Sequence, residues 1–355
     1  MAKKRKKRRG KLRAALVAMS LVLGLVLAVM LGGTVYAEYL LNKVNYRPES
    51  LDQMLTLEQL QQLQEILDSE TEPYDEDFKG PDLHEEDVLL EDAEDQIGGK
   101  GTGIVNIMLV GADYQSGKNA RSDVMILCTF NKAQKTITMT SFLRDTYVQI
   151  PGHSKNRLNA SYFLGGMDLL EKTLRQNFGV HLDGMVEIDF SHFQQLIDLL
   201  GGVEIELNSK EADFIVEKTG TKVNVGTNLL TGQQALWYSR FRGDASGDFG
   251  RTSRQREVLS IVLNEYKNSK LTTLLALMDD ILPMVTTNMS KAEVLGYVLE
   301  FFPMLAGSEL ITQRIPVEGG YKQARINGNA VIVPDLQVNI DALTESLLGL
   351  PEGVG

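Results

Sequence analysis

The sequence predicts an α/β fold in which a mixed central sheet is flanked by helices and preceded by an N-terminal transmembrane helix. Of the 355 residues, 43% are apolar and 23% are charged, so most of the chain can bury a core. From residue 104 onward, short β-rich apolar runs alternate with segments of helical periodicity. This alternation is typical of a sheet with helices on its faces. Before it, residues 14–37 contain no charged residue.

The first 37 residues predict a membrane anchor, because they carry nine cations and no acid. The uncharged run of 24 residues, at about 1.5 Å per helical residue, is long enough to cross a bilayer core of about 30 Å. All the cations precede it, so the positive-inside rule predicts a cytoplasmic basic tail at 1–13 and a transmembrane anchor at 14–37. A cleaved signal peptide is the alternative, but the run exceeds the usual core of about 7–15 residues. Next to a membrane span, the cations favour anionic lipid headgroups over nucleic acid.

Residues 38–100 are predicted to form an acidic extracellular stalk, with 19 acids against four bases. Leucines at helical spacing predict a helix or short coiled coil at 51–67. The dense acids and few aromatic residues of 68–95 predict a solvated spacer without fixed structure. The glycines of 98–103 lack the order of a phosphate-binding loop, which favours a hinge.

Residues 101–355 are predicted to form one packed domain. Ser191 is the expected N-cap of a helix that ends at Gly201, and Thr231 with Gln234 matches a capping box. The predicted strands lie at 104–110, 124–130, 136–142, 186–190, 203–207, 310–317 and 330–333. Further helices are predicted at 160–178, 252–268, 272–282 and 290–302, and a last one closes the domain.

Polar side chains gather where the first three predicted strands end or begin. Asp113 ends the first, Arg121 and Asp123 open the second, and Arg144 and Asp145 follow the third. Ligands of open α/β sheets collect at such strand ends. Asp113 and Asp123 are chemically sufficient for Mg²⁺ when phosphate oxygens and water complete its ligands. The alternative is that each aspartate caps a turn.

Within the predicted domain, arginines gather in the segment 240–256, which contains no lysine. An arginine offers a planar fork of donors that fits phosphate oxygens two at a time. Arg251, Arg254 and Gln255 share one face of a predicted helix whose N-terminus favours anions. The alternative is a solvated basic loop paired to local carboxylates. The segment contains Arg240, Arg242, Asp244, Asp248, Arg251, Arg254, Gln255 and Arg256.

Other chemistries lack their signatures. Cys128 is the only cysteine, so it cannot form an intrachain disulfide and is expected in the core. The four histidines are scattered without the paired spacing of a metal site. The sequence contains no Gly-x-Ser-x-Gly nucleophile motif.

Residues 104–265 resemble the LytR-CpsA-Psr family through a series of motifs in the same order. These are NIMLVGAD (106–113), RSD (121–123), SFLRD (141–145), YVQIPG (147–152), RLNASY (157–162), Gly165-Gly166, DLLGGV (198–203) and the arginine segment to Gln255. The resemblance implies an Mg²⁺-dependent, membrane-anchored phosphotransferase of a Gram-positive-type bacterium. Such an enzyme moves wall teichoic acid, capsule or a related glycopolymer from an undecaprenyl-pyrophosphate carrier to peptidoglycan.

The resemblance also implies a location, partners and roles for single residues. The protein is expected in the cell membrane as a single-pass type II protein with its catalytic domain (101–355) outside. Its expected partners are the carrier-linked glycopolymer, peptidoglycan and membrane lipids, but not nucleic acid. Mg²⁺, with Mn²⁺ as the alternative ion, is placed at Asp113 and Asp123. The expected catalytic residues are Arg121, Arg144, Asp145, Arg240, Arg242, Asp248 and Arg251, and the expected substrate-binding residues are Arg157, Asn159, Arg254 and Gln255.

Two positions depart from the family pattern. Leu143 stands where a proline is usual, which affects the turn. Arg157 stands where a lysine is usual, so the forked guanidinium of arginine replaces the point charge of an ammonium group. Asp248, or else Asp145, is expected to accept the proton of the attacking hydroxyl.

The prenyl chain is expected between the sheet and apolar residues that are equally suited to an ordinary core. These are Phe163, Leu169, Leu170, Leu196, Leu199 and Leu200.

Two other functions use the same residues. A hydrolase would release the lipid phosphate to water without transfer. A noncatalytic binder of anionic glycolipids would act as an assembly factor or regulator.

Overall fold

The computed structural model describes residues 38–39, 41–46, 80–93, 97–99, 102–113, 121–244, 247–266, 280–305 and 307–348. The predicted basic tail, transmembrane anchor and helix at 51–67 lie outside these residues, as does most of the predicted helix at 272–282. Within the described residues, no helix is both long enough and apolar enough to span a bilayer. The chain divides into two compact units, Met1–Val44 and Asn45–Gly355, and the second contains the sheet and the candidate site.

The second unit is built on a mixed seven-stranded sheet, as predicted. Its middle holds two antiparallel pairs, β3 with β4 and β4 with β5, while β8 runs parallel to β3 and β12 runs parallel to β5. In spatial order the strands are β1 (Asn45–Tyr46), β11 (Val285–Thr287), β8 (Gly184–Asp189), β3 (Ile104–Asp113), β4 (Arg121–Asn131), β5 (Thr136–Phe142) and β12 (Glu309–Ile315).

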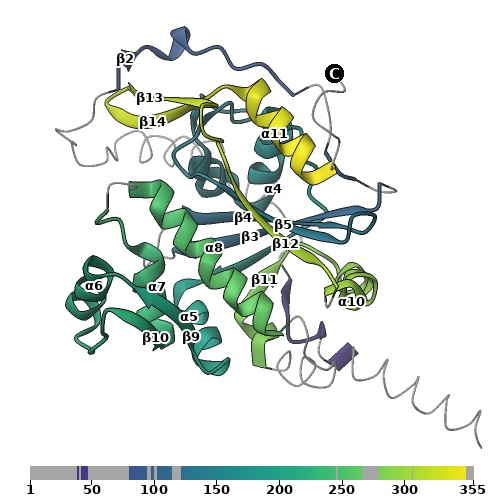
Figure 1. Cartoon of the computed structure of the whole chain (residues 1–355). Coiled ribbons are helices and arrows are strands. Elements are labelled where there is room, and N and C mark those ends of the chain that lie inside the picture. Colours follow the sequence, from purple (N-terminus) through teal and green to yellow (C-terminus); the bar gives the residue numbers. More distant parts are fainter. Residues whose placement is uncertain are drawn as a thin grey trace, which may run out of the picture. The chain divides into compact units, whose positions relative to one another are not determined.

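Helices cover both faces of this sheet (Figure 1). On one side lie α4 (Leu158–Phe178) and α11 (Leu336–Leu348), and on the other lie α5 (Phe190–Leu199), α7 (Gly232–Arg240) and α8 (Gly247–Tyr266). Met108 and Met125 point toward α4, whereas Ile126 and Cys128 share a cluster with α8. Cys128 is therefore a buried core residue, as predicted.

Smaller elements extend the domain at its periphery. Strands β9 (Val203–Leu207) and β10 (Gly226–Leu230) pair antiparallel, and the chain between them forms α6 (Ser209–Thr219). The remaining elements are β2 (Asp82–Leu83), η1 (Glu85–Asp87), β6 (Tyr147–Val148), β7 (Asn156–Arg157), η2 (Leu282–Met284), α10 (Lys291–Leu305), β13 (Tyr321–Ile326) and β14 (Asn329–Pro334).

The predicted stalk is wrong for its described part, because residues 80–93 and 97–99 pack on the domain. Strand β2 pairs in parallel with β13, and Val88 is buried in a cluster with Tyr147 and Ala324. Ile97 is also buried and forms a bridge with Val180. The acidic composition conceals these few apolar residues, whose partners lie far along the chain. The domain therefore begins before residue 100.

Several local predictions can be compared with the helix ends. The capping box of Thr231 and Gln234 is confirmed, since each side chain bonds the other residue's backbone N–H. Ser191 is not an N-cap. Asp189 caps α5 by accepting from the backbone N–H of His192, and Ser191 donates its hydroxyl to the same carboxylate.

Helix α8 begins at Gly247, five residues before the predicted start at 252, so Asp248 lies in its first turn. A carboxylate there is stabilised by the helix dipole. Helix α6 was not predicted, although Asn208 and Glu211 form a capping box at its start. Strand β13 is missing from the prediction as well, because the segment 321–326 is too polar to stand out, although β13 lies between β14 and β2 in its sheet.

Candidate active site

The candidate site lies at one edge of the central sheet. The directions of the strands bring the ends of β3, β5, β8 and β12 together with the start of β4. The predicted convergence of polar groups at strand ends is therefore confirmed at the level of the backbone, with Asp113 paired to Arg121 across β3 and β4. The side chains of Asp113 and Arg121 lie outside the described part of the structure.

Asp123 is placed by a β-bulge. Gly111 pairs with Val124, but the next residue, Ala112, pairs with Ser122, so Asp123 is the extra residue in β4. A bulge of this kind re-aims the side chain of the inserted residue. A Cβ atom at position 111 would lie 2.9 Å from the Cβ of Val124, so the close approach of the two strands requires glycine.

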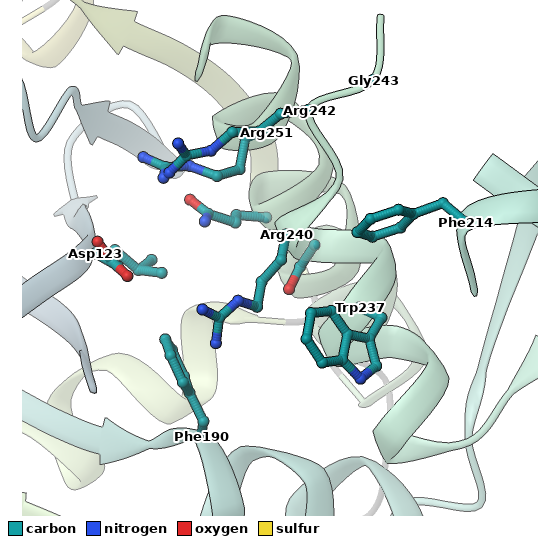
Figure 2. A pocket seen from close by; sticks show the side chains of 11 residues that line it. Asp123, Phe190, Phe214, Trp237, Arg240, Arg242, Gly243 and Arg251 are labelled. Carbon is teal, nitrogen blue, oxygen red and sulfur yellow. The ribbon is translucent and has the colours of Figure 1, made fainter. Parts of the chain in front are cut away.

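Asp123 lines a cavity of about 450 Å³, here called the polar cavity (Figure 2). Five of the predicted site residues line it, namely Asp123, Arg240, Arg242, Arg251 and Gln255. The structure also brings in residues that the sequence analysis did not single out, namely Phe190, Phe214, Trp237 and Ser239. Trp237 lies three positions before the predicted Arg240, Phe190 ends a predicted strand, and Phe214 lies on the missed helix α6, so no motif marked these aromatic residues as part of a site.

Arg144 joins three carboxylates behind this cavity. Its Nη1 donates to Oδ1 of Asp123 at 2.8 Å. Its Nε lies 3.3 Å from Oδ2 of Asp145 and 3.5 Å from Oδ2 of Asp248. The planar guanidinium thus fixes the three acids relative to one another.

Asp248 is held by further arginines. Its Oδ2 accepts from Nη2 of Arg251 at 2.9 Å, and its Oδ1 lies 3.2 Å from Nε of Arg242. The Arg251 side chain is only 3% exposed, whereas that of Arg242 is 43% exposed. Arg251 is therefore part of the cavity wall, and Arg242 reaches the cavity from the solvent side.

The arginines keep two of the acids ionised. Burial opposes the charge on Asp123, but Arg144, Arg251 and Arg240 outweigh it and lower the pKa of Asp123. Burial also opposes the charge on Asp248, yet Arg251, Arg144 and Arg242 lower its pKa. Burial lowers the pKa of Arg251 to about 10, so this guanidinium remains charged at neutral pH.

Asp145 behaves differently from Asp248, with which it titrates as a pair. Burial raises the pKa of Asp145, and the charge of Asp248 adds to this effect, while Arg144 and Arg157 oppose it. Of the two acids, Asp145 therefore holds a proton more readily and Asp248 carries the charge.

Three other predicted residues do not line the polar cavity. Nη1 of Arg157 lies 3.6 Å from Oδ1 of Asp145. The backbone N–H of Asn159 donates to the carbonyl of Arg144 at 3.1 Å. Arg254 donates from Nε to Glu211 at 2.7 Å and also pairs with Asp244. Arg157 and Asn159 thus support the Arg144–Asp145 turn, and Arg254 ties α8 to α6.

The leucine at position 143, where the family usually has proline, makes a backbone contact of its own. The N–H of Leu143 donates to the carbonyl of Ile315 at 2.9 Å, a bond that proline cannot make. This bond fastens the start of the Arg144 turn to the end of β12.

A second, apolar cavity of about 220 Å³ lies between the sheet and helices α5, α7 and α8. Leu109, Ile126 and Ile188 line it from the sheet. Leu196, Leu236 and Leu259 line it from the three helices. The two cavities share Val124, Phe190, Ser239 and Gln255, so they adjoin at these residues.

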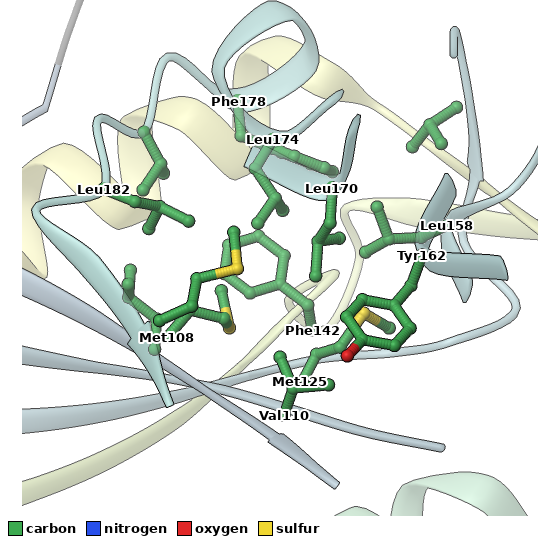
Figure 3. Close-up of a cluster of buried hydrophobic side chains, with 14 of the residues drawn as sticks. Met108, Val110, Met125, Phe142, Leu158, Tyr162, Leu170, Leu174, Phe178 and Leu182 are labelled. Atoms are coloured by element: carbon green, nitrogen blue, oxygen red, sulfur yellow. The ribbon is translucent and has the colours of Figure 1, made fainter. Parts of the chain in front are cut away.

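The apolar residues predicted to hold a prenyl chain are mostly elsewhere. Leu196 lines the apolar cavity, but Phe163, Leu169 and Leu170 belong to the closed core beneath α4. Figure 3 shows Leu170 in this core. Leu199 is partly exposed, and Leu200 is the C-cap residue of α5. Helical periodicity is the same on both faces of a sheet, so the sequence could not separate residues of the closed core from residues that line a cavity.

Comparison with known proteins agrees with this architecture. The profile of the LytR_cpsA_psr family matches residues 68–346, which include every strand of the central sheet except β1, both cavities and the packed residues 80–93 and 97–99. The chain belongs to this family. The predicted resemblance is confirmed, and the match from residue 68 agrees with a domain that begins before residue 100.

Individual relatives carry different names. The regulatory protein MsrR of Staphylococcus aureus is 30% identical over 229 residues, which are 64% of this chain and 69% of that protein. The polyisoprenyl-teichoic acid–peptidoglycan teichoic acid transferase TagT of Bacillus subtilis is 34% identical over 208 residues, 56% of this chain and 63% of TagT.

Solved structures show the same fold. TagT bound to LIIa-WTA has a TM-score of 0.59 at 27% identity, covering 73% of this chain and 96% of that one. The LytR-CPS2A-psr family protein YwtF (TagT) with bound octaprenyl pyrophosphate lipid has a TM-score of 0.53 at 26% identity, with 73% and 97% covered.

The residues present fit a divalent cation whose remaining ligands come from a substrate and water. The described residues contain no group of three or more His, Cys, Asp or Glu side chains placed to hold a metal. Asp123 does offer an ionised carboxylate to the polar cavity. Mg²⁺ is commonly held by one or two carboxylates together with phosphate oxygens and water, so Asp123 suffices as a protein ligand.

Proposed function

We propose that this protein transfers a glycopolymer from a polyprenyl-pyrophosphate carrier to peptidoglycan. The observation that carries the proposal is the junction of the two cavities, one apolar and one lined by arginines. A polyprenyl pyrophosphate has the same two parts, an apolar chain and an adjoining charged group. The relatives named for teichoic acid transfer and the related structure with octaprenyl pyrophosphate support this assignment.

In the proposed complex, the prenyl chain occupies the apolar cavity and the pyrophosphate lies past Gln255 and Ser239. Arg240, Arg242 and Arg251 line the polar cavity and stabilise the negative charge of the phosphate oxygens. Because they are held by ion pairs and aromatic stacking before a substrate arrives, little reorganisation is needed.

The reaction is an attack by an acceptor hydroxyl on the phosphorus that carries the sugar. A new P–O bond forms to the acceptor, and the bond to the bridging oxygen breaks. Its electrons remain on the departing polyprenyl phosphate, whose developing charge the arginines stabilise. The hydroxyl proton passes to Asp248, which is ionised and paired with Arg242 at the solvent side of the cavity. Its low pKa makes it a weak base, which suits a late proton transfer in a loose transition state.

Asp123, and Asp113 beside it on the backbone, would hold Mg²⁺ or Mn²⁺. Such an ion supplies charge neutralisation at the phosphate oxygens. The proposal further includes the type II anchor at 14–37, which would keep the site near the membrane surface where the carrier's headgroup lies.

The test uses the full-length chain in detergent micelles with Mg²⁺. It is incubated with an octaprenyl-pyrophosphoryl disaccharide and peptidoglycan oligomers, and the products are identified by mass spectrometry. A phosphodisaccharide linked to the oligomer is the expected product. Free phosphodisaccharide with octaprenyl phosphate would instead indicate a hydrolase. Tight donor binding without any product would indicate a noncatalytic binder.

Matched variants separate the site from the fold. Asp123→Asn should abolish transfer without unfolding the chain. Arg175→Ala removes an exposed arginine of α4, on the opposite face of the sheet, and should leave transfer unchanged.

A further inference from the structure

One wall of the polar cavity is aromatic, and the proposed phosphate chemistry gives its rings no contact with the substrate. Phe214 of α6 and Trp237 of α7 line this cavity together with the arginines (Figure 2). Their rings meet edge to face, with centroids 6.1 Å apart and planes at 76°. Phe214 also contacts Phe241 at 5.1 Å, so the wall is backed by a further ring.

The position of this wall relative to the apolar cavity indicates which part of a ligand it would face. Phe190, Ser239 and Gln255 line both cavities, whereas Phe214 and Trp237 line only the polar one. If the prenyl chain fills the apolar cavity, the carrier therefore crosses the junction at these shared residues before it enters the polar cavity. The group attached to its pyrophosphate would then lie against Phe214 and Trp237.

The acceptor would approach from a different direction. Asp248, the proposed proton acceptor, is paired with Arg242 and Arg251 rather than with the aromatic rings. The aromatic wall is thus on the donor's side. The half-buried rings of Phe214 and Trp237 lie next to the donors of Arg240, whose guanidinium stands over the Trp237 ring. Aromatic rings beside such donors match a pyranose, which has apolar C–H faces and a hydroxyl rim.

We infer that Phe214 and Trp237 form a subsite for the first sugar ring of the donor, next to the pyrophosphate. This inference rests on the proposed function, since it needs the carrier to lie in the two cavities. It adds that the protein distinguishes a glycosylated carrier from the bare polyprenyl pyrophosphate. The energy comes from stacking of the sugar on the rings.

Phe214 is the residue that tests the subsite most cleanly. Trp237 and Phe190 also hold the Arg240 guanidinium, whose carbon lies 5.4 Å and 4.7 Å from their ring centres. Changing either would disturb a phosphate-binding arginine as well. The ring of Phe214 packs instead against other aromatic rings and lies 5.5 Å from the ammonium of Lys218 on its own helix. Phe214→Ala therefore alters the wall and keeps both rings that hold Arg240, while it removes the edge contact that Phe214 makes with Trp237.

The experiment compares two ligands with the full-length chain in detergent micelles. Trp237 is the only tryptophan of the chain, so its fluorescence reports binding at this cavity. The ligands are octaprenyl pyrophosphate and octaprenyl-pyrophosphoryl N-acetylglucosamine. The wild type should bind the glycosylated ligand more tightly than the bare one. Phe214→Ala should weaken binding of the glycosylated ligand by about tenfold and leave that of the bare ligand within about twofold.

Two further variants make the outcome specific. Phe214→Leu keeps an apolar side chain without a ring and should behave like Phe214→Ala. Phe190→Ala should weaken both ligands because it removes a stacked partner of Arg240 at the junction. Equal affinities of the wild type for both ligands, or an equal loss for both in Phe214→Ala, would overturn the subsite while leaving the carrier assignment intact. Failure of the wild type to bind either ligand would instead remove the proposed function.

Discussion

The two faces of the central sheet are built by alternate residues of the same strands, yet one is closed and the other contains a cavity. Met108, Val110 and Met125 pack beneath α4 with at most 1% of their surface exposed. On the opposite face, Leu109 and Ile126 line the apolar cavity. Both sets are equally apolar, so the difference comes from the helices that cover them.

The covering helices differ in how they meet the sheet. On the closed face, α4 contributes Leu170, Leu174 and Phe178, which fill the space above the strands (Figure 3). Helix α11 adds Leu343 and Leu347 to the same core. On the other face, the cavity lies where α5, α7 and α8 converge on the sheet. Gly232 of α7 approaches α5 so closely that a Cβ would lie 2.0 Å from the carbonyl oxygen of Gln194. The two helices are therefore closely packed against each other and still leave space between themselves and the sheet. The cavity is thus a feature of the fold and not a result of loose helix packing.

The largest expected effect concerns stability on the closed face. Leu170→Ala should lower the free energy of unfolding by about 3 kcal/mol, because its neighbours cannot fill the space. Leu196→Ala, the same truncation at the apolar cavity, should cost about 1 kcal/mol, since one side of Leu196 lacks packing partners. Urea denaturation monitored by Trp237 fluorescence measures both. Equal losses of stability would show that the two faces are packed alike and would contradict the difference described between them.

The next effect is on turnover, at the polar end of the face that holds the cavity. Arg242→Ala should lower the transfer rate at least about 100-fold, as loss of a charge-stabilising donor in the transition state does. Its side chain is 43% exposed, so the unfolding midpoint should hardly change. Arg242→Lys keeps the charge but not the fork and should recover only part of the rate. Near-normal turnover of Arg242→Ala would remove this residue from the proposed role.

A smaller effect is expected from filling the apolar cavity. Val262 lines it from α8, and Val262→Phe should occupy space that the prenyl chain needs. Octaprenyl pyrophosphate should then bind about tenfold more weakly, with stability altered by no more than about 1 kcal/mol. Inorganic pyrophosphate, which needs only the polar cavity, is the control and should bind as before. Unchanged binding of the prenylated ligand would place its chain elsewhere.

The smallest effect is a pH dependence of stability at the acid pair. The pKa of Asp145 is raised above its ordinary value of 3.8 by burial and by Asp248. Its protonated form therefore stabilises the fold below that pH, and this contribution is lost as the pH rises through the raised pKa. Asp145→Asn lacks this titration. Relative to it, the wild type should lose stability in urea denaturation as the pH rises from about 4 toward 7. Parallel pH profiles would contradict the assignment of the proton to Asp145.

These experiments need the whole chain. A fragment starting at Gly101 would lack β2, Val88 and Ile97, all of which pack on the domain. Losing buried apolar residues and a strand would destabilise the domain for reasons unrelated to the site.

The sequence by itself determined the features that depend on short stretches of chain. The order of motifs identified the family, and the strand ends carrying Asp123 and Arg144 pointed to the site. The capping box at Thr231 was equally visible, because its two hydrogen bonds join residues three positions apart. Such local preferences depend only on neighbouring residues, so they can be predicted without knowledge of the fold.

Only the tertiary structure decided which residues share the site. Arg251 and Arg254 stand one helical turn apart, but Arg251 lines the polar cavity while Arg254 pairs with Glu211, 43 residues away. Phe214 lines the same cavity from a helix that the sequence did not predict, and Val88 packs with Tyr147 and with residues beyond 320. These outcomes depend on contacts between distant segments, and periodicity along one segment contains no information about the elements that will cover it.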